Sequence, residues 1–168
     1  MDTQDLTRQY LTFRLADEHY GLNVLQVREV LEIPRITRVP RMPVYMKGVI
    51  NIRGSVVPVI DLRLKLGLDE LENSVNSRVV IIEIETGQEK IALGILVDSV
   101  QEVVDIGQSE ISPPPRIGTK IESAFINGIA RLGQGFVIII NIDQVFDNQE
   151  MASLSGTSEN ADAITVEG

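Results

Sequence analysis

Short apolar runs separated by turn-forming residues recur along the whole chain. In residues 10–15, YLTFRL, apolar positions alternate with mostly polar ones, which is typical of a half-buried strand. The runs at 47–52 and 55–62 flank Arg53 and Gly54, and because glycine supplies the positive φ that tight turns need, they predict a β-hairpin with Arg53 at its tip. The longer runs VVIIEI (79–84) and FVIIINI (136–142) indicate strands covered on both faces, by a sister lobe or by a partner.

Two segments fit this strand pattern less simply. Residues 23–32, NVLQVREVLE, place apolar residues at helical spacing, yet Val and Leu also suit a strand, so a short helix and an irregular strand both remain open. Residues 33–43, IPRITRVPRMP, contain three prolines and three arginines, and this composition predicts an ordered loop.

The second half of the chain repeats the order of elements of the first half. Residues 127–142 overlay residues 47–62 at an offset of 80, and four further identities occur at an offset of 73. Those four pairs are Gly21 with Gly94, Val27 with Val100, Glu29 with Glu102, and Val30 with Val103. Strands share Val, Ile and Gly by chance, but turn positions match here as well, which favours a tandem pair.

Each copy would hold about five short strands, too few for a stable open sheet, so the sequence predicts an all-β protein of two small barrels. We expect one lobe at residues 8–75, a second at 76–147, and a mostly disordered acidic tail at 148–168. The sequence does not fix where one barrel ends, because terminal strands can cross between lobes.

Composition argues against an enzyme or a metalloprotein. The chain has no cysteine, and its one histidine is His19. The usual Cys and His ligands of a zinc site are therefore scarce, and His19 is the single candidate base for a Ser-His-Asp arrangement. Asp61 and Glu32 are poor candidates for catalytic carboxylates, because the sequence places no histidine, cysteine or phosphate-binding loop with them. The polar N-terminus and the lack of any apolar run near ~18 residues predict a cytoplasmic protein. We therefore expect no catalytic residue, no metal and no cofactor.

Charge is unevenly distributed along the chain. The net charge of -9 argues against nucleic acid as a general partner, since phosphate binding relies on clustered Lys and Arg. Residues 8–66 hold ten Lys or Arg against five Asp or Glu, a net of +5, whereas residues 67–147 hold five against thirteen, a net of -8. This division predicts one basic and one acidic lobe, whose attraction would favour head-to-tail contacts between molecules.

The duplication helps to separate structural from functional residues. Gly48 matches Gly128, which indicates a structural role for both. Arg53 matches Gly133, so this hairpin does not need an arginine to form. Arg53 is then either a solvated arginine on a turn or a residue kept for binding.

The segment from Val39 to Leu66, VPRMPVYMKGVINIRGSVVPVIDLRLKL, resembles the signature region of the CheW chemotaxis coupling proteins. The resemblance extends over about residues 8–150 through YGLNVLQVREVLE, GILVDSVQEVVDI and FINGIARLGQGFVIIINID. It implies two SH3-like five-stranded β-barrel lobes in tandem with short helical segments.

The same resemblance implies a non-enzymatic adaptor with two kinds of partner. One is the cytoplasmic tip of membrane chemoreceptors, bound in a groove between the lobes, and the other is the regulatory domain of the histidine kinase CheA, bound through barrel edges. The receptor-binding positions carried over to this chain are Val27, Glu29, Gly48, Arg53, Val100 and Val103. The alternative is another SH3-like interaction module, for instance one that binds nucleic acid through Arg35, Arg38 and Arg41.

Overall fold

The computed structural model describes residues 6–70, 72–86, 89–113 and 125–146. Within these ranges the chain forms strands and a few single-turn helices, which confirms the all-β prediction. None of these short helices is long and apolar enough to cross a membrane. The predicted tail at 148–168 lies outside the described residues.

The strands are β1 Thr7–Leu15, β2 Glu18–Asn23, β3 Val27–Glu32, β4 Met46–Ile52, β5 Ser55–Asp61, β6 Arg78–Thr86, β7 Glu89–Val97, β8 Ser99–Gly107, β9 Ile111–Ser112, β10 Ile126–Leu132 and β11 Gly135–Ile140. The helical turns are η1 Val24–Gln26, α1 Leu62–Lys65, η2 Gln108–Glu110 and α2 Ile142–Val145.

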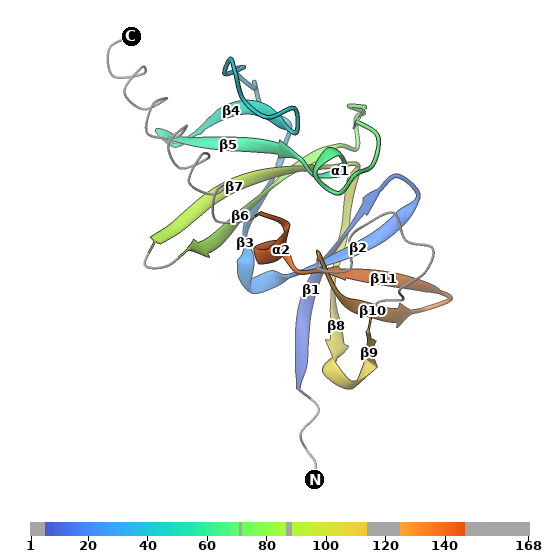
Figure 1. Cartoon of the computed structure of the whole chain (residues 1–168). Helices are drawn as coiled ribbons and strands as arrows, with labels where there is room; N and C mark the ends of the chain where they lie inside the picture. The colour runs from blue at the N-terminus through green and yellow to red at the C-terminus, as the bar shows by residue number, and fades with distance from the viewer. Residues whose placement is uncertain (1–5, 71, 87–88, 114–124, 147–168) are drawn as a thin grey trace.

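The strands form two sheets, which lie in two lobes (Figure 1). The five-stranded lobe has the order β3-β6-β7-β5-β4, and the six-stranded lobe has the order β8-β1-β2-β11-β10-β9. Apart from the two-residue β9, each lobe therefore has five strands, in agreement with the predicted pair of five-stranded barrels. The segment left open between helix and strand contains both, the turn η1 followed by β3.

Corresponding strands of the two repeats take the same places in the two sheets. The parallel pair Ile139 with Gly21 in the six-stranded lobe repeats the pair Val59 with Gly94 in the five-stranded lobe. Ile139 lies 80 residues after Val59 and Gly94 lies 73 after Gly21, so the register follows the two sequence offsets. Chance similarity does not account for matching registers.

The two repeats nevertheless exchange their opening hairpins. The hairpin β1–β2 pairs with strands of the second repeat, while β6–β7 pairs with strands of the first. The sheets therefore divide the chain into 27–97 on one side and 7–23 with 99–140 on the other, which differs from the expected lobes 8–75 and 76–147. Similarity between repeats reveals which strands correspond, but it does not reveal which copy of a hairpin a sheet takes up.

This exchange removes most of the expected charge difference between the lobes. Among the described residues, 24–98 carry ten basic and ten acidic side chains, and 6–23 with 99–113 and 125–146 carry three basic and six acidic ones. The net charges are 0 and -3, so the prediction of one basic and one acidic lobe is wrong. The basic and acidic segments are mixed because each lobe draws strands from both halves of the chain.

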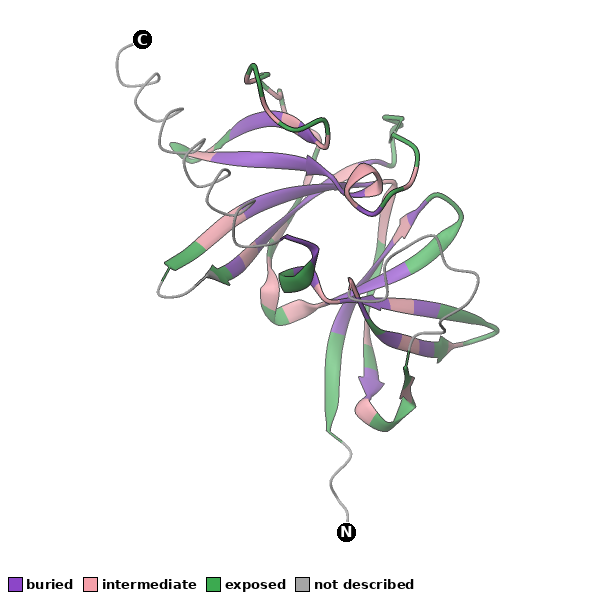
Figure 2. Ribbon diagram, in the orientation of Figure 1, coloured by how far each residue is buried: buried purple, intermediate pink, exposed green. Residues whose placement is uncertain are grey.

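The buried residues form one core inside each lobe and a third, larger core that both lobes share. In β6, Val79 and Ile81 face the interior of the five-stranded lobe, while Val80, Ile82 and Ile84 belong to the shared core. The shared core also takes side chains from β1, β2 and β11 of the other lobe. Figure 2 shows the buried positions along these strands. The expectation of cover on both faces is confirmed for the run 79–84, where the sister lobe provides the second cover, but in the run 136–142 the Phe136 side chain is 57% exposed.

Candidate functional site

Arg53 stands at the tip of the hairpin between β4 and β5, as the sequence predicts. Ile52 pairs with Ser55, which leaves Arg53 and Gly54 as a two-residue loop with φ values of 49° and 89°. Positive φ at both positions defines a type I′ turn, in which Asn and Gly are the favoured residues. The Asn51 side chain supports the turn by accepting a hydrogen bond of 2.9 Å from the Gly54 N–H. An arginine in this left-handed conformation is unfavourable, so its presence indicates a role beyond the turn itself.

The Arg53 guanidinium forms a forked ion pair with Glu29 on β3. Its Nη2 contacts Oε2 of Glu29, and its Nη1 lies 3.5 Å from Oε1. The hydrogen bond from Arg53 lowers the pKa of Glu29, so the carboxylate is ionised at neutral pH. The Arg53 side chain remains 74% exposed. The pair therefore joins two strands at the mouth of the barrel while the guanidinium still faces solvent.

Gly48 on β4 allows the segment that follows β3 to cross close to the sheet at Thr37. Its φ is 145°, and a Cβ at this position would lie 2.2 Å from the carbonyl oxygen of Thr37. Thr37 and Val49 exchange two backbone hydrogen bonds of 2.8 Å at this crossing. Gly48 is buried, so its contribution to any binding surface is through the backbone that it shapes. Gly128 is equally crowded, because its Cβ would lie 2.3 Å from Ile111 Cγ2, in line with the structural role predicted for both glycines.

The three predicted valines lie at the margin of the shared core. Val27 pairs with Ile82, Val100 with Phe13 and Val103 with Leu11, and all three partners belong to that core. Val27 and Val100 are partly buried against it, whereas Val103 is 47% exposed. Cross-strand partners share one face of a sheet, so the valines extend the shared core outward to the surface.

Val30 has the same surroundings as Val103, although it was not among the predicted site residues. It pairs with Val80 of the shared core and is 39% exposed. The offset of 73 that relates Val30 to Val103 is the signal that could have identified it. Val30 and Val103 are thus the accessible apolar positions of this set, whereas Val27 and Val100 are partly buried against the shared core.

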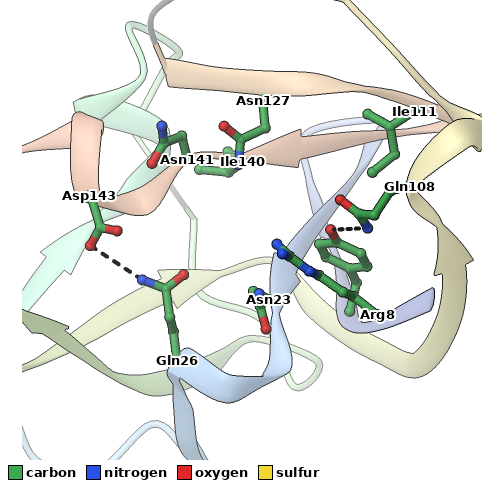
Figure 3. Close-up of a pocket in the computed structure, with 10 residues that line it drawn as sticks. Arg8, Asn23, Gln26, Gln108, Ile111, Asn127, Ile140, Asn141 and Asp143 are labelled. Atoms are coloured by element: carbon green, nitrogen blue, oxygen red, sulfur yellow. Dashed lines mark hydrogen bonds between the residues drawn. The ribbon is translucent and has the colours of Figure 1, made fainter. Parts of the chain in front are cut away.

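A polar cavity of about 510 Å³ lies elsewhere, in the six-stranded lobe beside η1 and α2 (Figure 3). Gln26 donates a 3.3 Å hydrogen bond to Asp143 across one side, and Gln108 donates one of 3.2 Å to the Tyr10 hydroxyl on the other. The Arg8 side chain extends toward the space between them. None of the six predicted binding residues lines this cavity. Its amide-rich wall can bind a polar group but has no nucleophile paired with a base.

Asp61 and His19, considered from the sequence for catalysis or metal binding, make hydrogen bonds within the fold. Asp61 is fully buried and caps α1 by accepting a hydrogen bond from the Leu64 N–H at 3.3 Å. His19 lies at a β-turn end and its Nδ1 is 2.7 Å from Oε1 of Gln101. Within the described ranges, no group of three or more His, Asp or Glu side chains could hold a metal ion.

Comparisons with known proteins agree with this architecture. Residues 9–150 match the family model described as a CheW-like domain. The chain is 31% identical over 152 residues to the chemotaxis protein CheW of Klebsiella aerogenes, covering 90% of this chain and 89% of that protein. It is 33% identical over 143 residues to CheW of Bacillus subtilis, covering 85% and 89%. The crystal structure of the scaffolding protein TtCheW from Thermoanaerobacter tengcongensis superimposes with a TM-score of 0.75 at 39% identity, covering 84% of this chain and 94% of that one.

Proposed function

Since the chain belongs to the family of CheW-like domains, we propose that this chemotaxis scaffold couples methyl-accepting chemoreceptors to the histidine kinase CheA. Proteins of this family are scaffolds and not enzymes. The coupling protein works in the cytoplasm, where it binds the receptor's cytoplasmic tip with one surface and the regulatory domain of CheA with another.

The receptor tip binds across the edge strand β3, where Glu29 and Val30 are consecutive residues whose side chains lie on opposite faces of the sheet. A receptor helix lays its apolar face on Val30 and Val103, as amphipathic helices do in apolar grooves. The exposed guanidinium of Arg53 gives this contact orientation, because a charge-assisted hydrogen bond is both stronger and more directional than apolar contact. The observation that carries the proposal is Arg53 itself, held in an unfavourable backbone conformation although the sister turn uses glycine.

The CheA regulatory domain pairs end to end with this chain through barrel edges. Such edges present unpaired backbone groups, to which a strand or loop of a similar barrel can add. Because the described residues of the two lobes have net charges of 0 and -3, opposite lobe charges do not drive this contact, and we expect it to depend on apolar and backbone interactions. The receptor and kinase surfaces must be separate, since a scaffold has to hold both partners together.

Nucleic-acid binding through Arg35, Arg38 and Arg41 is not supported by a comparable observation. All three arginines are exposed, but the lobe that carries them has as many acidic as basic side chains. The electrostatic attraction that phosphate binding needs is therefore offset locally.

Replacing Arg53 by alanine should weaken binding of a receptor-tip fragment by about tenfold, because one charge-assisted contact is lost. The fold should be retained, since the matched hairpin forms with Gly133 in the same position. Titration of the immobilised receptor fragment with each variant measures the change. Gly133→Ala is the matched control, and it should bind the receptor like the wild-type protein. Unchanged affinity in Arg53→Ala, or an equal loss in Gly133→Ala, would contradict the proposed role of Arg53.

A further inference from the structure

The six-stranded lobe has a small pocket at the mouth of its barrel. The pocket has a volume of about 220 Å³ and lies where β1, β2 and β8 approach the β10–β11 hairpin. Its wall is apolar on the hairpin side and polar on the opposite side. The lining residues are Thr12, His19, Gln101, Glu102, Leu132, Gly135, Phe136 and Val137.

The duplication shows which side chain occupies the position equivalent to this pocket in the five-stranded lobe. Glu102 lies 73 residues after Glu29, and Gly133 lies 80 residues after Arg53. In the five-stranded lobe the Arg53 guanidinium reaches from the hairpin to Glu29. In the six-stranded lobe the hairpin has Gly133 in place of Arg53. Glu102 therefore has no arginine at the tip of this hairpin to pair with.

The Glu102 carboxylate is left exposed at this pocket. Within the described part of the chain, no Lys, Arg or His lies within ion-pair distance of it. The Thr12 hydroxyl fixes the backbone of Glu102, donating 2.8 Å to its carbonyl oxygen and accepting from its N–H at 3.2 Å. The backbone at Glu102 is thus fixed by Thr12, and the carboxylate has no cation from the tip of the hairpin.

We propose that this pocket, defined by Glu102 and the β10–β11 hairpin, receives the arginine side chain of a partner protein. The guanidinium takes the place relative to Glu102 that Arg53 takes relative to Glu29. Leu132, Phe136 and Val137 provide an apolar wall for the aliphatic part of the arginine side chain. The binding mode is therefore the one the chain already uses within its other lobe.

The neighbouring side chains of Arg131 and His19 do not occupy this place. Arg131 lies over the Phe136 ring, 5.8 Å from its centroid, and is not among the lining residues. His19 lines the pocket but its Nδ1 is engaged with Gln101. This inference goes beyond the coupling of receptors to CheA and does not depend on it, because guanidinium binding can be measured with the isolated protein.

Backbone amide shifts of the full chain should reveal the site when acetyl-arginine amide is titrated in. We expect saturable shifts at the pocket residues, and about tenfold weaker binding in Glu102→Gln, since one charge-assisted contact is lost. Asp105→Asn is the matched control, because it removes the same charge from the same strand outside the pocket, and it should change affinity less than about twofold. Acetyl-lysine amide should bind more weakly, because an ammonium cannot form the fork.

Gly133→Arg provides a second, independent variant. Gly133 has φ 61°, close to the 49° at which the chain holds Arg53, so an arginine can adopt the same turn conformation there at a similar cost and should fill the pocket from within. Acetyl-arginine amide should then no longer bind, while Gly133→Ala should still bind it. Absence of pocket shifts, equal binding by Glu102→Gln, or equal binding of the lysine compound would overturn the proposal. Tighter binding of free arginine than of acetyl-arginine amide would assign the pocket to a small molecule and overturn the assignment to a partner protein.

Discussion

Replacing Phe13 by alanine should lower the free energy of unfolding by about 3–5 kcal/mol, the usual cost of removing a buried aromatic side chain. Phe13 is fully buried in the core shared by the lobes, and its ring stacks on Tyr20 with centroids 6.0 Å apart. Because both lobes bury residues in this core, the whole protein should lose stability as one unit. Urea unfolding followed by circular dichroism measures the change.

Phe136→Ala is the matched control for this prediction. The Phe136 side chain is 57% exposed, so its removal should cost less than about 1 kcal/mol. Both variants should unfold in a single transition. A curve for Phe13→Ala that separates into two phases, with one phase unshifted, would show that the lobes are energetically independent.

Replacing Gly48 by alanine should also lower the free energy of unfolding by about 3 kcal/mol, from two lost hydrogen bonds and backbone strain. The new methyl group would lie 2.2 Å from the Thr37 carbonyl oxygen, and the crossing segment would have to move. That movement breaks the two hydrogen bonds between Thr37 and Val49, each worth about 1 kcal/mol, and the φ of 145° adds strain for any residue with a Cβ. The midpoint and slope of chemical denaturation give the loss directly.

Gly54→Ala separates the clash from backbone strain. Gly54 also has a positive φ, 89°, but a Cβ there has no atom within 4 Å. It should cost about 1–2 kcal/mol, from conformation alone. If Gly48→Ala were no more destabilising than Gly54→Ala, the close crossing at Gly48 would not contribute to stability.

Much of the fold follows from local pattern in the sequence. Arg53 and Gly54 between two apolar runs predict the hairpin, since glycine supplies the positive φ that a tight turn needs. The unbroken run at 79–84 predicts a strand buried on both faces, which the shared core explains. The offsets of 73 and 80 predict two similar barrels, and strand register follows those offsets.

The exchange of the opening hairpins between the two sheets could not be predicted from local sequence pattern. The hairpins β1–β2 and β6–β7 hold the same place in the order of elements of their repeats, and that order does not show which sheet takes up which hairpin. The exchange is decided by chain geometry and by packing between distant segments. The prediction of one basic and one acidic lobe was wrong for the same reason, because it assigned neighbouring segments of the sequence to the same lobe.

The candidate site was predictable where the repeats differ and less so where they agree. Arg53 stood out because its counterpart is glycine, and the structure adds its ion pair with Glu29. The pocket at Glu102 follows from the same difference, but only the structure shows that an opening remains there. The exposure of Val30 depends on how the lobes pack, which a single sequence does not reveal.

The central claim is that one molecule holds a receptor tip and the CheA regulatory domain together on separate surfaces. Co-sedimentation of all three components tests it most directly, with the receptor fragment immobilised and the CheA domain added with and without this chain. We predict that the CheA domain is retained only when this chain is present, and that Arg53→Ala lowers retention of both soluble proteins together. Displacement of the chain from the receptor by the CheA domain would contradict the claim, since it would mean that the two partners compete for one surface.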